Sequence, residues 1–467
     1  MKETRPNILL ITTDQQRFDT LSFCNKDSGV NTPNLEALAK RGVNFTQAFV
    51  QNPVCIPSRA CWQTGRYTHQ HGVTYMEEII DDTPGLPAWE LSFMERLQCA
   101  GYRTAAFGKI HMMPEKGFDE LKVTGGKGVR WTKSAGLPIG LGPLGRDYAA
   151  WLEARNPGAY EKIYAGRNVP EYKKYRSAIT ANLPVEDYIE SWITENTEEF
   201  ITRDHDKPFF AWCGFCGPHD PFDPPEPYAS MYKPEDINLP PNFGYDTGGQ
   251  PVNQTEEQIT AAKKIVCHYY ALVSLIDDMI GRLMAALEKK GILDNTLIIF
   301  TSDHGEMLGE FGRYGKGNFY DSIIHVPFIA SFPGNVKGGG TVADLIETYD
   351  LAPTVLDYAG AGIPRTMSAS SLRPILEKTK TGRELIISEF TTYDRKRTGI
   401  CIRTPAHKYW RYTDGEEAFF DLASDPYERE NRISDPALAS DIRHLRDLLL
   451  DRLMECANCT PTKNGVW

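Results

Sequence analysis

The stretch CIPSR contains a cysteine, Cys55, with an arginine, Arg59, four residues further on. In a helix this spacing brings the two side chains to the same face. A cysteine that only fills a hydrophobic core needs neither a proline nor an arginine beside it. The pattern therefore indicates a residue with a chemical role, and a buried core thiol is the alternative interpretation.

Several residues with reactive or charged side chains follow apolar segments. Asp14 comes directly after NILLITT, and Asp303 comes directly after NTLIIFTS; Lys109 and His219 follow two further apolar segments. Such segments are typical of buried parallel strands. Because ligands bind at the carboxyl ends of parallel strands, we expect these four side chains to converge on one crevice. The alternative is that the carboxylates cap helices, the lysine lies on the surface and the histidine is structural.

Helical patterns separate these expected strands. Residues 33–41 have Thr32 as a candidate N-cap, Pro33 at the first helical position and Gly42 at the end. A longer helical pattern runs over residues 256–290. This alternation of helices and apolar strands predicts an α/β fold with a mostly parallel sheet sandwiched by helices.

The pattern changes after about residue 380. Shorter strand patterns, which suggest hairpins, and one more helical pattern lie at residues 384–390, 399–412, 416–425 and 441–454. They predict a small antiparallel α+β subdomain at the C-terminus. We therefore expect a catalytic domain over residues 1–380, with an insertion at about 112–184, and a C-terminal subdomain over residues 381–467.

Residues 122–176 differ from the rest of the chain in charge. They contain eleven Lys and Arg against four Asp and Glu, whereas the whole chain has a net charge of −11. They also contain seven large aromatic residues: Trp131, Tyr148, Trp151, Tyr160, Tyr164, Tyr172 and Tyr175. One interpretation is a surface insertion with a solvated face. The other is a lid that attracts an anionic substrate and stacks a ring on aromatic side chains.

Composition argues against two classes of partner. A net charge of −11 disfavours general nucleic-acid binding, which relies on a basic surface. No apolar run reaches the ~18 residues of a membrane span, so we expect no membrane partner. The N-terminal apolar run ends at Asp14 without a small-residue cleavage site, which predicts a cytoplasmic protein. A chain from which a signal was removed would instead be periplasmic or secreted.

Ten cysteines are scattered along the chain without the spacing of a disulfide framework. CGFC at residues 213–216 and CANC at residues 456–459 have the spacing of zinc knuckles. If the two pairs met, the chain would be a zinc-clipped binding protein. Free thiols are the simpler interpretation.

The motif CIPSR resembles the Cys-x-Pro-x-Arg motif of the sulfatase family, which belongs to the alkaline-phosphatase superfamily. Five further segments resemble family motifs in the same order along the chain: LLITTDQQRFDTL, TPNLEALAKRGVNFTQAF, GKIHM, TSDHGEMLGEFGRYGKG and HKYWRYTDGEEAFFDLASDPYERENR. The resemblance covers most of the chain. It implies an alkaline-phosphatase-like fold and hydrolysis of a sulfate ester, with a sugar or aryl O-sulfate as the expected substrate.

The resemblance also implies a site for one divalent metal ion. Asp14, Gln15, Asp303 and His304 resemble the protein ligands of the family, and the modified side chain of Cys55 completes the set. Gln15 and His304 depart from the commoner Asp and Asn. Calcium is our first expectation. Manganese is the second, because an imidazole suits manganese or zinc better than calcium.

In the family, a separate maturation enzyme oxidises the motif cysteine to formylglycine. One hydroxyl of the formylglycine hydrate attacks sulfur. The other is later deprotonated, so that the hemiacetal collapses and releases inorganic sulfate. The resemblance assigns Cys55 as this nucleophile, with Arg59 steadying it and with Lys109 and Lys316 binding ester oxygens.

The resemblance assigns two histidines to proton transfer. His111 takes the proton of the second hydroxyl, and His219 protonates the leaving oxygen, for which a pKa near neutrality is suited. We interpret His69 and His71 as structural, although they follow the nucleophile closely in sequence. We interpret the acidic residues 77–82 as a solvated loop.

The metal pattern leaves a second activity open. Asp14 with Gln15 and Asp303 with His304 resemble the phosphonate monoester hydrolase branch, so hydrolysis of a phosphonate monoester or a phosphodiester is the alternative function. In either case we expect a small anionic substrate, with a sulfated saccharide as one candidate. A homo-oligomer is compatible with the sequence.

Overall fold

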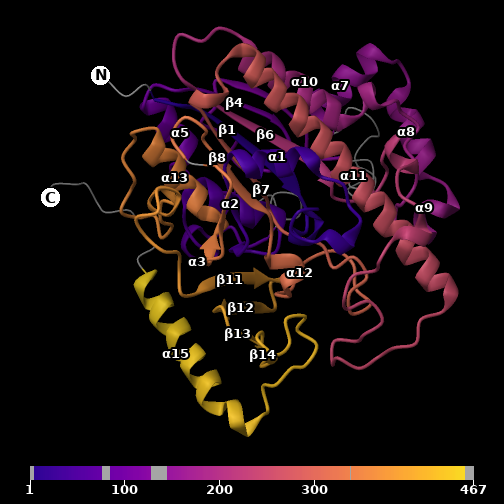
Figure 1. Cartoon of the computed structure of the whole chain (residues 1–467), viewed down its shortest axis with the longest axis vertical. Coiled ribbons are helices and arrows are strands. Elements are labelled where there is room, and N and C mark those ends of the chain that lie inside the picture. The colour runs from indigo at the N-terminus through magenta and orange to yellow at the C-terminus, as the bar shows by residue number, and fades with distance from the viewer. Residues whose placement is uncertain (1–4, 76–84, 128–144, 337, 458–467) are drawn as a thin grey trace.

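The computed structural model describes residues 5–75, 85–127, 145–336 and 338–457 (Figure 1). Its centre is an eight-stranded sheet with the strand order β5-β4-β6-β1-β7-β8-β2-β9. All strands run parallel except β8, which is antiparallel to both neighbours. The strands are β1 (Asn7–Asp14), β2 (Val43–Phe45), β4 (Arg103–Gly108), β5 (Glu120–Val123), β6 (Phe209–Pro218), β7 (Thr296–Ser302), β8 (Phe328–Ser331) and β9 (Gly340–Val342). The predicted, mostly parallel sheet is therefore confirmed.

Side chains of β1 alternate between two hydrophobic layers. Leu9 and Ile11 pack into one cluster, whereas Ile8 and Leu10 pack into the other. Because successive side chains of a strand point to opposite faces, both faces of the sheet are buried. The apolar character of the whole NILLITT segment follows from this double burial.

Helices cover both faces, as predicted. The first layer contains α1 (Pro33–Arg41), α7 (Arg146–Arg155), α8 (Ala159–Arg167), α10 (Ile189–Thr202) and α11 (Glu256–Lys290). The second layer contains α2 (Cys55–Thr64), α5 (Phe93–Cys99), α13 (Leu351–Tyr358), α14 (Arg373–Leu376) and α15 (Ala439–Glu455). The remaining described α-helices are the short α3 (Thr68–His71), α9 (Pro170–Lys174) and α12 (Asp321–Ile324).

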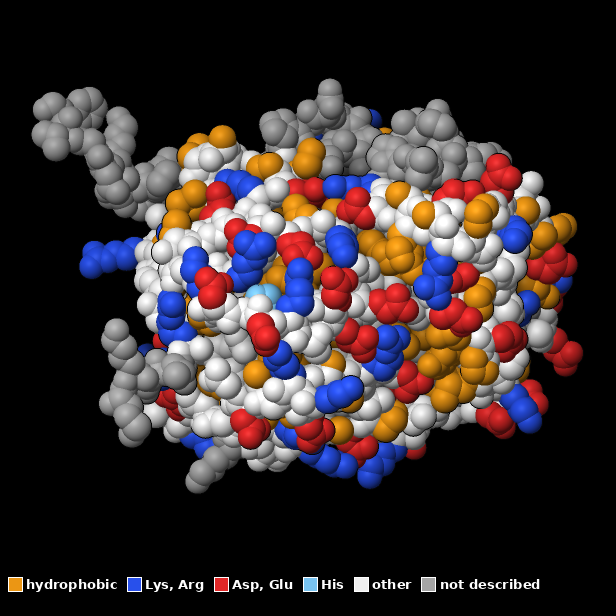
Figure 2. Space-filling model, turned by 90° about the horizontal axis from the view of Figure 1, so that it is seen from above, with side chains coloured by type: hydrophobic (Ala, Val, Ile, Leu, Met, Phe, Trp, Pro, Cys, Tyr) orange, Lys and Arg blue, Asp and Glu red, His pale blue; other side chains and the backbone are white. Residues whose placement is uncertain are grey.

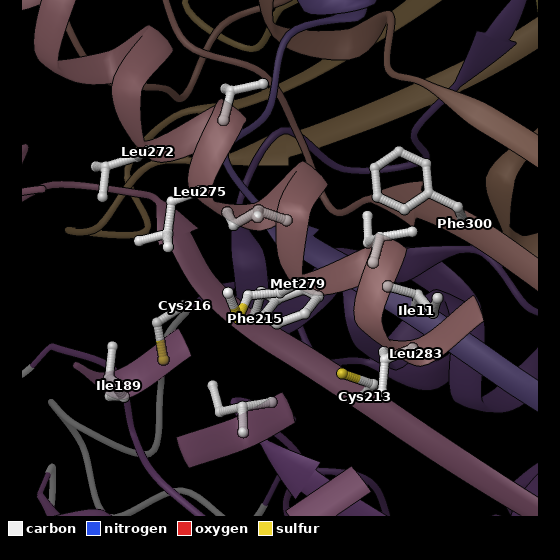
Figure 3. Packing of buried hydrophobic residues seen from close by; sticks show 14 of the residues in the cluster. Ile11, Ile189, Cys213, Phe215, Cys216, Leu272, Leu275, Met279, Leu283 and Phe300 are labelled. Atoms are coloured by element: carbon white, nitrogen blue, oxygen red, sulfur yellow. The ribbon is translucent and has the colours of Figure 1, made fainter. Parts of the chain in front are cut away.

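The long helix α11 organises the first layer. Figure 3 shows Leu275, Met279 and Leu283 of this helix beside Phe215 and Ile11 of the sheet. Its N-terminus is closed by a capping box in which Thr255 accepts a hydrogen bond from the backbone of Gln258. The helix therefore has a local start signal as well as a buried apolar face.

The two CxxC segments do not meet. Cys213 and Cys216 lie among apolar side chains of the first layer (Figure 3), and Cys456 is buried in the second layer. Burial raises the pKa of the Cys213 thiol to about 12. Because the sheet separates these residues, they do not form a joint zinc site; Cys459 lies outside the described residues.

The C-terminal part contains the predicted antiparallel sheet, which lies below the main sheet in Figure 1. Its strands are β11 (Ile386–Thr391), β12 (Thr398–Arg403), β13 (His407–Tyr412) and β14 (Glu417–Asp421). A two-stranded parallel pair, β3 (Ala48–Phe49) and β10 (Ile346–Glu347), lies outside both larger sheets. Ile387, Ile402 and Phe419 share a hydrophobic cluster with the second helix layer. The C-terminal sheet therefore shares its core with the main sheet, and the predicted boundary at residue 380 stays a prediction.

The region predicted as an insertion contributes to the main body. Glu120–Val123 form the edge strand β5, and Tyr148 and Leu152 of α7 lie in the first hydrophobic layer. Tyr148 stacks on Trp151, with 6.0 Å between the ring centroids. Tyr148 is therefore part of the core and is not available to stack a substrate ring, whereas Trp151 is half-buried against it. Trp131 and the acidic residues 77–82 lie outside the described residues, and the side chains of Tyr160 and Tyr164 are likewise not described.

The surface carries charged side chains of both signs. Figure 2 shows one face of the molecule, on which acidic and basic side chains are interspersed. Within the described part of the chain, no helix combines the length and the apolar character that crossing a membrane requires.

The start of α1 differs from its prediction. Thr32 makes no side-chain cap and instead accepts a hydrogen bond from the backbone N–H of Ser22 at 2.9 Å. The carboxylate of Asp277, on α11, accepts from the N–H groups of Asn34 at 2.9 Å and Leu35 at 2.8 Å. A distant residue therefore caps this helix, which a local sequence pattern does not reveal.

The glycine that ends α1 is required for a different reason than expected. Gly42 has φ −133°, so it is not a left-handed C-cap. A Cβ atom at this position would meet the carbonyl oxygen of Ala330 and would lie 2.6 Å from Cα of Ser331. Close approach to β8 therefore selects glycine here.

We expect Gly42→Ala to lower the free energy of unfolding by about 1–3 kcal/mol, because the added methyl group overpacks against backbone atoms that have little room to move. Gly362→Ala is the matched control, since a Cβ there meets nothing within 4 Å. Urea unfolding of both variants measures the difference. Equal stabilities would show that the contact with β8 is not tight.

Candidate active site

Four neighbouring parallel strands bring the predicted residues together. Asp14 ends β1, and Lys109, His219 and Asp303 directly follow β4, β6 and β7. Lys109 Nζ lies 2.6 Å from Asp14 Oδ2, and His219 Nε2 lies 3.9 Å from Asp14 Oδ1. The expected convergence at the carboxyl ends of the strands is present in the structure.

Helix α2 brings Cys55 and Arg59 to the same place. Cys55 is the first residue of this helix, and Gly65, with φ 62°, closes its other end in the left-handed conformation. Every residue of the helix is buried. Since the N-terminal end of a helix carries partial positive charge, position 55 faces an electrostatic environment that favours an anion.

Arg59 joins the two strand-end carboxylates. Its Nε–H donates to Asp303 Oδ2 at 2.8 Å, and its Nη2 donates to Asp14 Oδ2 at 3.4 Å. A third donor, Nη1, reaches the carbonyl oxygen of Lys109 at 2.7 Å. Burial alone would raise the pKa of Asp14, but the charges of Lys109 and the other nearby cations hold it well below its usual value. Asp14 is therefore ionised although it is fully buried.

Four buried side chains form a group that fits a divalent cation. The ligand atoms of Asp14, Cys55, Asp303 and His304 all lie within 4.8 Å of one another. His304 Nδ1 donates to the carbonyl oxygen of Gly305 at 2.8 Å, which directs the lone pair of Nε2 toward Cys55 and Lys316. Two carboxylates and one imidazole form a donor set that suits a hard or borderline divalent metal.

Lys316 lies against this group. Its Nζ is 2.5 Å from Cys55 Sγ and 2.9 Å from His304 Nε2. Burial alone would lower the pKa of Lys316, but its contact with Cys55 and the carboxylates of Asp14 and Asp303 raise it above its usual value. With Arg59 and Lys109, three cations therefore face two carboxylates, so the site carries an excess of positive charge.

Gln15 lies beside the group, in a strained backbone conformation with φ 71°. Its backbone N–H donates to Asp303 Oδ1 at 3.1 Å, and its side-chain amide donates to the buried carboxylate of Glu306. The structure thus places Gln15 at the site. Its assignment as a metal ligand stays a prediction.

His111 has one free ring nitrogen. Its Nε2–H donates to the carbonyl oxygen of Gly125 at 3.1 Å, whereas its buried Nδ1 has no hydrogen-bond partner among the described residues. Burial, reinforced by the charges of Lys109 and Arg59, lowers its pKa well below 6.5. The imidazole is therefore neutral, and Nδ1 can accept a proton.

His219 differs from the expectation of a pKa near neutrality. Its Nδ1 donates to the backbone carbonyl oxygen of Asp220 at 2.6 Å, and its Nε2 lies 3.3 Å from Lys316 Nζ. Burial and then the charge of Lys316 lower its pKa to about 4. The ring is accordingly neutral at pH 7 in the free protein.

The two histidines next to the nucleophile helix have structural partners. His71 is buried; its Nε2 lies 3.3 Å from Cys61 Sγ, and its Nδ1 accepts from the N–H of Val73 at 3.1 Å. His69 Nδ1 pairs with Glu389 of β11 at 2.7 Å. These contacts support their interpretation as structural residues.

Three residues at the site lie outside the predicted set. Glu306 accepts a hydrogen bond from Gln15, and Tyr314 lies two residues before Lys316. Both belong to the segment TSDHGEMLGEFGRYGKG, so their position in this motif is a sequence signal that points to them. Burial raises the pKa of Tyr75, and the nearby charge of Lys316 acts in the opposite direction. No sequence signal distinguishes Tyr75 from other surface tyrosines.

Comparison with known proteins decides the family. A sequence profile described as Sulfatase matches residues 6–361. An arylsulfatase from Clostridium perfringens (strain 13 / Type A) is 31% identical over 466 residues, covering 96% of this chain and 94% of that protein. The chain belongs to the sulfatase family. This sulfatase is a sulfuric ester hydrolase with the fold of the alkaline-phosphatase superfamily.

Further matches extend over the rest of the sulfatase. A profile described as "N-sulphoglucosamine sulphohydrolase, C-terminal" matches residues 309–455. An N-acetylglucosamine-6-O-sulfatase from Bacteroides thetaiotaomicron is 26% identical over 522 residues, covering 95% of this chain and 86% of that protein. The solved phosphonate monoester hydrolase of Agrobacterium radiobacter matches with a TM-score of 0.82 and 25% identity, covering 97% of this chain and 96% of that one.

We expect Asp303→Asn to weaken calcium and manganese binding at least ~10-fold, because it removes a charged ligand rather than an outer-shell partner. Calorimetric titration of the metal-free protein measures the affinity, and circular dichroism checks that the variant folds. Asp206→Asn removes the same charge from an exposed loop and should bind like the native protein. An unchanged affinity for Asp303→Asn would contradict the metal site.

Proposed function

We propose that this sulfatase hydrolyses the O-sulfate ester of a saccharide or an aryl alcohol, with formylglycine at position 55 as the nucleophile and one divalent cation as cofactor. The observation that carries the proposal is the buried group of Asp14, Cys55, Asp303 and His304, whose ligand atoms lie within 4.8 Å of one another. The similarity to an arylsulfatase and to an N-acetylglucosamine-6-O-sulfatase supports both substrate classes.

The cations of the site match the charge of a sulfate ester. Arg59, Lys109 and Lys316 are positively charged against the two carboxylates of Asp14 and Asp303, so the residual charge is positive. Ammonium and guanidinium groups stabilise the non-bridging oxygens as charge moves during the reaction. We infer that Lys109 and Lys316 bind these oxygens, while Arg59 holds the carboxylates and the nucleophile in position.

An unmodified Cys55 is poorly suited to attack. Burial and the negative charge of Asp14 raise the pKa of its thiol, so the thiolate is disfavoured. Conversion to formylglycine by a separate maturation enzyme replaces the thiol with an aldehyde, whose hydrate offers two hydroxyl groups. The raised pKa of the thiol therefore supports a nucleophile that acts only after modification.

Asp14, Asp303 and His304 would hold the metal ion together with the modified side chain of position 55. When bound, a divalent cation supplies positive charge for the ester oxygens and favours the deprotonated form of a hydroxyl group. The two carboxylates fit calcium, and the imidazole fits manganese. Calcium stays our first expectation.

Two histidines provide the proton transfers in this proposal. His219 lies next to Lys316, and binding of an anionic ester there would offset the ammonium charge that lowers its pKa. It then protonates the leaving oxygen. His111, through its free Nδ1, accepts the proton of the second hydroxyl so that the hemiacetal collapses.

One observation favours a second candidate function. The solved phosphonate monoester hydrolase of Agrobacterium radiobacter shares 25% identity and nearly the full length with this chain. A phosphonate monoester carries one negative charge, like a sulfate ester, so the cation cluster by itself does not distinguish the two. Hydrolysis of a phosphonate monoester or phosphodiester in the same site is therefore the alternative.

We expect active protein to carry an aldehyde at position 55. Mass spectrometry of the peptide containing CIPSR should show a mass lower than that of the thiol form, and a hydrazine probe should label it. Cys55→Ala should fold normally and lose essentially all turnover. Full activity of a sample whose Cys55 is entirely unmodified would contradict the mechanism. Rates on nitrophenyl sulfate, sulfated sugars, a phosphodiester and a phosphonate monoester then choose between the two functions.

We expect the effect of His219→Ala to depend on the leaving group. A sugar alkoxide needs a proton to leave, whereas nitrophenolate leaves readily as an anion. General acid catalysis contributes ~10²–10⁴-fold, so the loss in kcat should approach this range on a sugar sulfate and be much smaller on nitrophenyl sulfate. His111→Ala should slow both substrates equally, because the enzyme-bound intermediate no longer contains the leaving group. Equal losses for His219→Ala on both substrates would remove it as the general acid.

A further inference from the structure

A cavity of about 700 Å³ opens beside the active site. Three of its lining residues are chain neighbours of site residues: Gln15 follows Asp14, Asp220 follows His219, and Gly315 precedes Lys316. The cavity is far larger than a sulfate group and has the size of a ligand-binding pocket. Its position next to His219, the residue that we assign to the leaving oxygen, places it on the leaving-group side.

Part of the lining of this cavity is basic. Lys173 and Lys174 of α9, and Arg176 two residues after this helix, line the cavity. Lys174 pairs with Glu257 at 3.1 Å, but among the described residues neither Lys173 nor Arg176 has a carboxylate partner. Two exposed cations therefore line the cavity without an ion-pair partner among the described residues.

Two acidic residues, Asp220 and Glu306, also line the cavity, and among the described residues neither forms an ion pair with Lys173 or Arg176. Asp220 Oδ1 lies 3.2 Å from His219 Nδ1. Glu306 accepts hydrogen bonds from the backbone N–H groups of Leu308 and Gly315 and from the side chain of Gln15.

Arg176 is held in place by its surroundings. Its guanidinium carbon lies 4.4 Å from the ring centroid of Tyr314, so the planar group stacks on an aromatic face. Arg176 and Ser177 have φ values of 47° and 69°, which are unfavourable for residues with a side chain. Hydrogen bonds hold this turn: Ser177 N donates to Tyr172 O at 2.6 Å, and Ile179 N donates to Phe222 O at 3.1 Å. Backbone strain of this kind gathers at binding sites.

We propose that this cavity is a leaving-group subsite that binds a second anionic group of the substrate, and that Arg176, stacked on Tyr314, is its specificity-determining residue. A planar guanidinium pairs in a bidentate manner with a carboxylate or a sulfate, and Lys173 adds a point charge beside it. The substrate class is therefore a saccharide that carries an oxyanion in addition to the scissile sulfate. This inference rests on the proposed function, since it assigns the leaving group of the same reaction.

The experiment compares substrate pairs that differ by one negative charge. One pair is N-acetyl-D-glucosamine-6-O-sulfate and D-glucosamine-2-N,6-O-disulfate; the other is nitrophenyl sulfate and carboxyphenyl sulfate. Binding to the inactive Cys55→Ala protein is measured by calorimetry, and kcat/KM is measured on the active enzyme. The first pair reports on a second sulfate and the second pair on a carboxylate.

We expect the native protein to prefer the doubly charged member of at least one pair. Arg176→Gln should reduce that preference by about 10-fold or more, the effect of one charge-assisted hydrogen-bonded pair. Arg176→Lys should restore only part of it, because a lysine keeps the charge but not the planar, stacked group. Lys162→Gln, which removes an exposed cation from α8 outside the cavity lining, should keep the native preference.

Either of two results would overturn the subsite: no preference for the doubly charged member in the native protein, or a preference that Arg176→Gln leaves intact. Failure of the proposed function has a different outcome, because the calorimetric arm requires no turnover. Preferential binding without hydrolysis of any sulfate would reject the reaction and retain the anion subsite.

Discussion

The structure depends on pairing two buried carboxylates with cations at the carboxyl edge of the sheet. Asp14 and Asp303 have fully buried side chains, and Arg59 bridges them while Lys109 binds Asp14 at 2.6 Å. Burying a charge without a partner is unfavourable, and removing one member of a buried pair typically costs about 3–5 kcal/mol. The strand order β4-β6-β1-β7 and the position of α2 must therefore occur together, because each provides one part of this network.

The rest of the second layer holds α2 against the sheet. Trp62 packs in the same hydrophobic cluster as Phe419 of the C-terminal sheet, and its indole N–H donates to Thr348 at 2.9 Å. Glu389 of β11 binds both the backbone and the side chain of His69, which lies in the short helix α3 that follows α2. The C-terminal part thus stabilises the element that carries Cys55 and Arg59, although among the described residues it provides none of the predicted site residues.

Chemistry and specificity come from different kinds of surroundings. The charged groups around Cys55 are buried, held by strand ends and by one helix, and partnered on several sides. Arg176 is exposed and belongs to the turn after a short helix, where its contacts are an aromatic ring and the cavity. Rigid burial suits groups that stabilise a transition state, whereas an exposed turn can change its side chains without disturbing the core.

The sequence by itself determined the parts that depend on local pattern. The apolar segments that end at Asp14 and Asp303 predict buried parallel strands, and parallel strands bring their carboxyl ends to one edge. The motif CIPSR, with its four-residue spacing, places Arg59 beside Cys55 once a helix forms. Side-chain types at these positions therefore indicate the α/β fold, the location of the site and its chemistry.

Tertiary structure alone decided what depends on partners distant in the chain. The cap of α1 is Asp277, not the neighbouring Thr32. The pKa of His219 is lowered to about 4 because the ring is buried and lies next to the charge of Lys316. Tyr148 was a candidate for ring stacking but packs in the core, whereas Arg176 faces the cavity next to the site. Burial and pairing are properties of the folded arrangement, since they depend on which surfaces the other elements cover, and no local spacing encodes that information.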